Sequence, residues 1–134
     1  MSQTVLAAYD GSPSARRALG YAADLAGPGG TVAVVNVIPV SGLSARVETV
    51  TAEERARQRA LLREARAALS RRRVEVVTVP AAGEPLTEIL DAARDVDATV
   101  ILAGRGGAGR RHLLHGSFGV KLAKRAACDV LLAA

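Results

Sequence analysis

The chain has 134 residues, of which 49% are hydrophobic and 23% charged, and its formal net charge is +5. A chain of this length can bury a core of its own, so we expect a single domain over residues 1–134 that needs neither disulfides nor a structural metal. The single cysteine excludes a disulfide framework and a cysteine-rich zinc site, and no apolar run reaches the ~18 residues of a membrane span. We therefore expect a cytoplasmic protein with no membrane partner.

The first predicted elements are a strand, a helix and a second strand. The strand over 5–8 ends at the turn sequence Tyr9-Asp10-Gly11, and Ser12 then caps a helix whose first residue is Pro13. A continuous β-branched run over 31–38 predicts a strand that is covered on both faces.

The second predicted helix is rich in arginine. Thr51 and Glu54 have the spacing of a capping box at its start, and the helix extends to about Ser70. From 53 to 73 the chain holds eight arginines and three glutamates. Helical spacing predicts an apolar side made of Ala56, Ala60, Leu61, Ala65, Ala68 and Leu69.

The remaining elements continue the alternation of strands and helices. A valine-rich strand over 74–79 is predicted to end at Pro80. A helix starting at Gly83-Glu84-Pro85, a strand over 99–103, a helix over about 116–126 and a strand over 129–133 follow. Five strands alternating with four helices predict a doubly wound α/β fold, a parallel sheet with right-handed crossovers.

The stretch after the fourth strand has the composition of an anion site. It holds four glycines within six residues, Gly104 to Gly109, and residues 98–128 contain six lysines and arginines, including Arg105, but no acid. Glycine backbone can aim several N–H groups at one phosphate, and the helix start at Gly116-Ser117 adds a positive dipole end. The alternative is that the glycines serve only the turn and that Gly116-Ser117 is an ordinary helix start.

Two named nucleotide motifs fit poorly. The letters GRGGAG match G-x-G-x-x-G, but they follow the fourth strand, whereas the dinucleotide fingerprint belongs to the first strand-to-helix turn. The stretch also lacks the lysine and the Ser/Thr of a P-loop. NAD binding and phosphotransfer are therefore disfavoured.

Several segments together resemble the nucleotide-binding type of the universal stress protein family. They are VLAAYDGSPSARRALGYAADLA, VVNVI, DATVILAGRGG and CDVLLAA. The family's glycine motif, G-x2-G-x9-G-[ST], is matched with one residue fewer by Gly104, Gly107, Gly116 and Ser117; aligned backward from Gly116, Gly106 fits and Ala103 replaces the first glycine. The resemblance implies a Rossmann-like sheet in the order 3-2-1-4-5 with helices on both faces and a homodimer paired through the last strand. It also implies ATP in the crevice outside the carboxyl ends of the strands.

The resemblance also implies roles for individual residues. Asp10 would hold the ribose hydroxyls or the adenine side, and it could help to hold Mg²⁺ with ATP; its alternative role is that of a turn residue. Ala8 and Tyr9 would border the base, and Val37 would offer main-chain groups to the adenine. The phosphates would be held by Gly104, Arg105, Gly107, Gly116, Ser117 and Phe118.

These observations favour a nucleotide-binding regulatory protein of the stress response over a dedicated catalyst. No pair of nucleophile and base is visible, so we expect at most slow ATP hydrolysis. One alternative is a dimeric interaction module that binds no nucleotide. Another is a nucleic-acid binder that uses the arginines from Arg55 to Arg73, which the aromatic content of only 2% disfavours.

Overall fold

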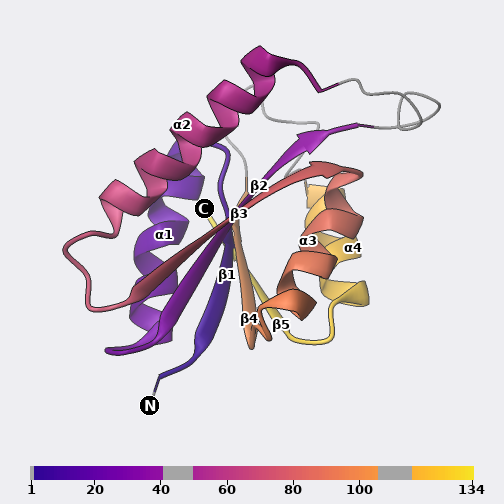
Figure 1. The fold of residues 1–134 in the computed structure, drawn as a ribbon. Helices are drawn as coiled ribbons and strands as arrows, with labels where there is room; N and C mark the ends of the chain where they lie inside the picture. The colour runs from indigo at the N-terminus through magenta and orange to yellow at the C-terminus, as the bar shows by residue number, and fades with distance from the viewer. Residues whose placement is uncertain (1, 41–49, 106–115) are drawn as a thin grey trace.

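A computed structural model describes residues 2–40, 50–105 and 116–134 of the chain. Its five strands form one parallel sheet in the order β3-β2-β1-β4-β5 (Figure 1). The predicted strand order is therefore confirmed. The strands are β1 (Thr4–Ala8), β2 (Thr31–Pro39), β3 (Glu75–Gly83), β4 (Val100–Gly104) and β5 (Asp129–Ala133).

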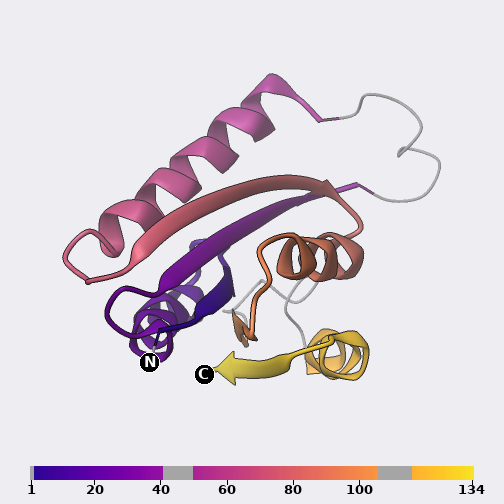
Figure 2. The same cartoon turned by 60° about the horizontal axis from the view of Figure 1, so that its bottom comes forward.

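The helices cover both faces of the sheet. Helices α1 (Pro13–Ala26) and α2 (Ala52–Ala68) lie on one face, and α3 (Pro85–Asp95) and α4 (Gly116–Arg125) lie on the other (Figure 2). Each face has its own cluster of buried hydrophobic side chains. None of the helices in the described ranges is long and apolar enough to cross a membrane.

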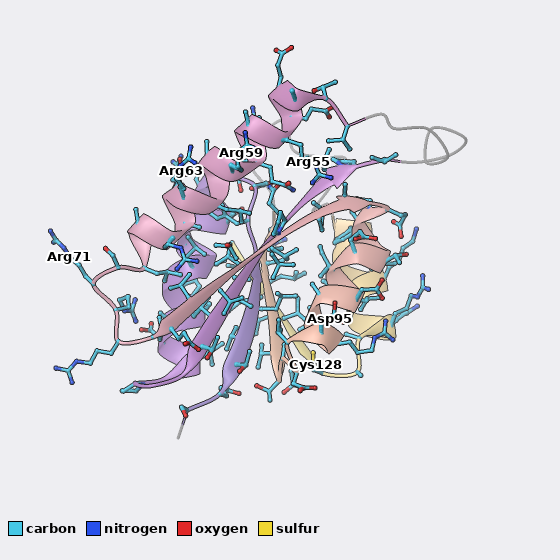
Figure 3. All side chains as sticks on the ribbon, in the orientation of Figure 1. Arg55, Arg59, Arg63, Arg71, Asp95 and Cys128 are labelled. Atoms are coloured by element: carbon cyan, nitrogen blue, oxygen red, sulfur yellow. The ribbon has the colours of Figure 1, made fainter. Side chains whose placement is uncertain are left out.

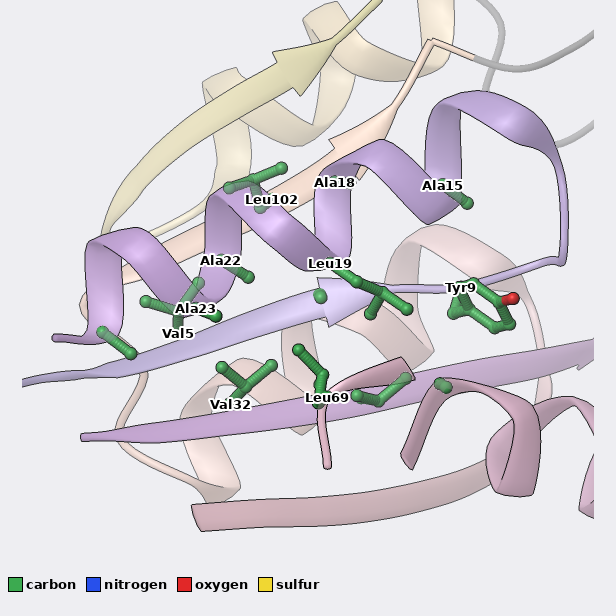
Figure 4. Packing of buried hydrophobic residues seen from close by; sticks show 14 of the residues in the cluster. Val5, Tyr9, Ala15, Ala18, Leu19, Ala22, Ala23, Val32, Leu69 and Leu102 are labelled. Carbon is green, nitrogen blue, oxygen red and sulfur yellow. The ribbon is translucent and has the colours of Figure 1, made fainter. Parts of the chain in front are cut away.

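The alternation of side chains along β1 divides its residues between the two clusters. Val5, Ala7 and Tyr9 pack in the cluster beneath α1 and α2, part of which Figure 4 shows. Leu6 and Ala8 pack in the other cluster, with residues of α3 and α4. The end of β1 therefore contributes to both faces of the sheet.

The predicted helix caps are present. Ser12 Oγ accepts a hydrogen bond from the main-chain N of Ala15 over 3.2 Å, at the start of α1. Thr51 and Glu54 exchange two hydrogen bonds of 3.0 Å, which form the predicted capping box of α2. Such caps bind N–H groups that the first turn of a helix leaves without partners.

The third strand does not end at Pro80. β3 continues through Pro80 to Gly83 and pairs with β2 over its whole length. It lies at the edge of the sheet, where the absence of an N–H on proline removes no ladder hydrogen bond if that position faces outward. The prediction of a strand end was wrong because the edge position could not be known from the strand's own letters.

The predicted apolar side of the second helix is only partly correct. Ala65 and Leu69 are buried, but Ala56, Ala60 and Ala68 are exposed. The buried positions instead include Leu62 and Gln58, and Gln58 is only 2% exposed. Helix α2 thus faces the sheet through a narrower apolar stripe and one polar side chain.

Candidate functional site

A pocket lies at the carboxyl ends of β1 and β2. In a doubly wound sheet, this end is where ligands bind, at the point where strand order reverses beside β1. The structure brings five of the predicted residues to this pocket: Ala8, Tyr9, Asp10, Val37 and Phe118. The other lining residues are Val35, Asn36, Pro85 and Ile89.

The pocket exists because β1 ends before β2. Their pairing stops at Ala8 and Val35, after which the Tyr9 N–H donates to the Val35 oxygen over 2.9 Å. Main-chain groups alternate between the two sides of a strand, so Val37 directs its N–H and C=O toward the same side as Val35. Beyond the end of β1, Val37 therefore offers one donor and one acceptor to the pocket.

Asp10 has one satisfied and one unsatisfied carboxylate oxygen. Oδ1 accepts a hydrogen bond from the main-chain N of Ser12 over 2.9 Å, which is the geometry of a turn residue. Oδ2 is buried and has no hydrogen-bond partner among the described residues. A buried acceptor without a donor is costly, so this atom is suited to a donor from a ligand.

Tyr9 is a lining residue of the pocket, and its side chain makes its contacts outside the pocket. Its ring lies beneath α1, near Ala15 and Leu19, on the sheet face opposite Ala8 (Figure 4). The Tyr9 hydroxyl donates to Glu64 of α2, and Arg16 Nη2 lies 3.5 Å from the same carboxylate. Burial, followed by the hydrogen bond to Glu64, raises the pKa of Tyr9 to about 12. The main chain of Tyr9 is therefore the part that can border a ligand.

Asn36 and Gln58 form a polar link behind the pocket that the sequence did not reveal as such. Asn36 Nδ2 donates to the Tyr9 oxygen over 2.8 Å. Gln58 Nε2 lies within 3.1 Å of the Asn36 side-chain oxygen and within 2.9 Å of its main-chain oxygen, and it also contacts the Ala81 oxygen. The link connects α2 to the ends of β1, β2 and β3.

Sequence signals existed for some of the lining residues to which the prediction gave no role in binding. Asn36 is the one polar residue in the apolar stretch from Val32 to Ile38, which marks it as a residue with a special partner. Pro85 and Ile89 were assigned to helix α3, but only the fold shows that its first turns reach the pocket. Gln58 gave no signal, because glutamine between arginines is typical of a solvated helix face.

The residues predicted for phosphate are only partly described. Gly104 is buried at the end of β4, and a Cβ atom there would lie 2.5 Å from Ser14 Oγ and 2.7 Å from the Ala15 nitrogen. The Arg105 N–H already donates to the Ala133 oxygen over 2.7 Å. Gly107 lies outside the described residues, and Gly116 and Ser117 begin α4.

The start of α4 lies next to the pocket, since Phe118 of its first turn is a lining residue. The N-terminal end of a helix carries partial positive charge and free N–H groups. The pocket therefore has an acidic group at Asp10 and a helix end suited to an anion. Among the residues that the structure describes, no group of three or more His, Cys, Asp or Glu could hold a metal.

The fold and the sequence are similar to those of known proteins. The family model of the universal stress protein family matches residues 1–134. The universal stress protein UspA from Lactobacillus plantarum has a TM-score of 0.80 at 19% identity, with 98% of this chain and 97% of that chain covered. No curated protein is significantly similar in sequence.

Two further solved structures contain a nucleotide. A universal stress protein from Archaeoglobus fulgidus in complex with dAMP has a TM-score of 0.74 at 25% identity, covering 100% of this chain and 98% of that one. A universal stress protein in complex with cAMP has a TM-score of 0.73 at 25% identity, covering 98% and 97%.

Proposed function

The chain belongs to the universal stress protein family, and from this premise we propose that it binds an adenine nucleotide, ATP in particular, at the carboxyl ends of β1 and β2. The observation that carries the proposal is the buried Asp10 Oδ2, which has no donor among the described residues. The nucleotide complexes of two similar proteins support the class of ligand.

The adenosine half of the ligand fits the chemistry of the pocket. Ala8, Ile89 and Phe118 offer apolar contacts to a flat base. The main chain of Val37 provides a donor and an acceptor, which adenine can match along one edge. Asp10 Oδ2 accepts a hydrogen bond from a ribose hydroxyl, as acidic residues do in other α/β nucleotide sites.

The phosphates lie toward the start of α4 in this proposal. The helix end at Gly116-Ser117 favours negative charge, and Arg105 is an exposed cation at the end of β4. Gly104 and Gly107 belong to the same sequence motif. A triphosphate would bring Mg²⁺, which would add a positive charge at the phosphates and could share Asp10 as a ligand.

The role that we propose is regulatory, in a stress response in the cytoplasm, with nucleotide occupancy as the signal. The site contains one carboxylate and no nucleophile–base pair among its described residues, which supports binding rather than dedicated catalysis. We further propose a homodimer through the outer edge of β5. Leu131 is 47% and Leu132 is 42% exposed on that strand, so an apolar surface is available there.

The test is calorimetric titration of refolded, nucleotide-free protein with AMP, ADP and ATP. We expect binding by the natural chain and a loss of about tenfold or more for Asp10→Asn, because a hydrogen bond to a charged acceptor is worth ~1.5–3 kcal/mol. Asp95→Asn is the matched control, since Asp95 is an exposed carboxylate at the end of α3. Absence of heat with all three nucleotides at near-millimolar concentration would refute nucleotide binding.

A further inference from the structure

Helix α2 carries a row of arginines along one side. Arg55, Arg59, Arg63 and Arg66 are all exposed. With 3.6 residues per turn they fall within an arc of about 80° and span ~16 Å of the helix axis. Figure 3 shows Arg55, Arg59 and Arg63 following one another along α2.

The charge of this arginine row is not neutralised within the described part of the chain. Arg55 Nη1 donates to the Gln58 side-chain oxygen over 3.1 Å, and Arg66 Nη1 donates to the Val76 main-chain oxygen over 3.2 Å. Both acceptors are uncharged. Arg59 and Arg63 have neither an ion pair nor a hydrogen bond to the residues that the structure describes.

The acids of α2 lie on other sides of the helix. Glu54 is held by the capping box, and Glu64 binds the Tyr9 hydroxyl and lies beside Arg16. The helical period places Glu53, Glu54 and Glu64 at least about 80° around the helix from the row. The row is therefore a continuous cationic surface without an acid inside it.

The spacing of the row matches an acidic helix. Arg55, Arg59 and Arg63 are four residues apart, so successive charges are separated by ~6 Å along the axis. A second helix with carboxylates at every fourth residue has the same rise and the same drift of about 40° per step, so its charges match those of the row where the two helices cross. All cations of α2 are arginines, whose planar fork binds a carboxylate through two hydrogen bonds.

We propose that the arginine row of α2 is a docking surface for an acidic helical segment of a partner protein. None of the four arginines of the row lines the pocket at the ends of β1 and β2, so this proposal does not rest on the proposed nucleotide binding. Duplex DNA is the competing polyanion, because arginines bind phosphates as well as carboxylates. The row drifts by about 40° around the helix axis at each step of four residues, and the matching row of a second helix follows such a drift when the two helices cross at about −50°, whereas DNA phosphates follow the edge of a groove.

The experiment measures binding of an alanine-rich helical peptide with glutamate at every fourth position. The control peptides carry glutamine in place of glutamate, or the same number of glutamates without the four-residue spacing. We expect the periodic peptide to bind more tightly than both controls, with an affinity that falls as salt is added. Equal binding of the two glutamate peptides would overturn the match of spacing.

The variant Arg59→Glu with Arg63→Glu is expected to weaken binding of the periodic peptide by at least about tenfold, since two ion pairs become two repulsions. Lys121→Glu with Lys124→Glu on the exposed side of α4 changes the net charge equally and should preserve binding. If circular dichroism shows that the reversed charges reduce folding, the variant Arg59→Gln with Arg63→Gln replaces it in the binding measurement. An equal loss in the α4 variant, or tighter binding of a short DNA duplex through the same two arginines, would overturn the proposal.

Discussion

Asn36 donates from Nδ2 to the main-chain oxygen of Tyr9 over 2.8 Å, at the place where the pairing of β1 and β2 ends. A side chain thus occupies the acceptor that the next residue pair of the sheet would have used. Gln58 holds Asn36 in turn from α2. The width of the opening between the two strands is therefore fixed by polar side chains.

Replacing Asn36 by alanine should lower both stability and nucleotide affinity. The Tyr9 oxygen and the Gln58 amide would each lose a buried partner, which costs ~1–3 kcal/mol. Urea unfolding followed by circular dichroism measures the loss. A double-mutant cycle with Gln58→Ala is the control. The double variant should lose clearly less stability than the sum of the two single losses, because both substitutions break the same network. Additive losses would show that the two side chains act independently.

Tyr9 should make the fold sensitive to alkaline pH. Its pKa is about 12 in the folded chain, against 10.0 for a tyrosine that is free in water. A raised folded-state pKa gives stability that is present below pH 10 and is lost as pH rises toward 12. Between pH 9 and pH 11 we expect a loss of about 1 kcal/mol in the free energy of unfolding. Tyr9→Phe, which keeps the ring, should remove that part of the slope, and an unchanged slope would contradict the assignment.

Gly104→Ala should destabilise the chain. The added Cβ would approach Ser14 Oγ to 2.5 Å and the Ala15 nitrogen to 2.7 Å, and the latter belongs to rigid helix backbone. Overpacking of this kind costs ~1–3 kcal/mol. Gly20→Ala is the matched control, because its Cβ would meet nothing within 4 Å and alanine is a better helix former than glycine. In thermal unfolding, we expect a melting temperature below that of the natural chain for Gly104→Ala and above it for Gly20→Ala.

The proposed dimer can be tested on the two edge strands. Leu131 on β5 is 47% exposed and Val77 on β3 is 38% exposed, so both are accessible apolar side chains. Sedimentation velocity should show a dimer for the natural chain and for Val77→Lys, and a monomer for Leu131→Lys. A dimer that survives Leu131→Lys but not Val77→Lys would place the interface on β3.

The sequence was most informative where structure depends on neighbouring residues. The caps at Ser12 and Thr51 were predicted because such contacts span only three residues. The strand order came from the resemblance to a family, since each strand's letters do not reveal its neighbours. β3 continues through Pro80 because it lies at the edge of the sheet, and that position depends on the arrangement of all five strands.

The candidate site was predicted in the same uneven way. Residues at or just after the carboxyl end of a strand, such as Val37 and Asp10, could be placed because parallel strands end at one edge of the sheet. The direction of the Tyr9 ring and the burial of Gln58 depend on how α2 packs, and the letters around them are typical of many surfaces. The Asn36–Gln58 contact joins residues 22 positions apart, beyond the range of any local pattern.

Gly104, the first glycine of the family's glycine motif, lies close to the first turn of α1. A glycine at this position is therefore not by itself a sign of nucleotide binding. The absence of a side chain at Gly104 makes room for Ser14 and Ala15. A relative that no longer binds any ligand could therefore retain this glycine because α1 packs against β4 there. Asp10 Oδ1 accepts from the main-chain N of Ser12, but its Oδ2 has no hydrogen-bond partner among the described residues. In a relative with the same contact between α1 and β4, the residue at the position of Asp10 is therefore the better marker for sorting nucleotide binders from chains that keep only the fold.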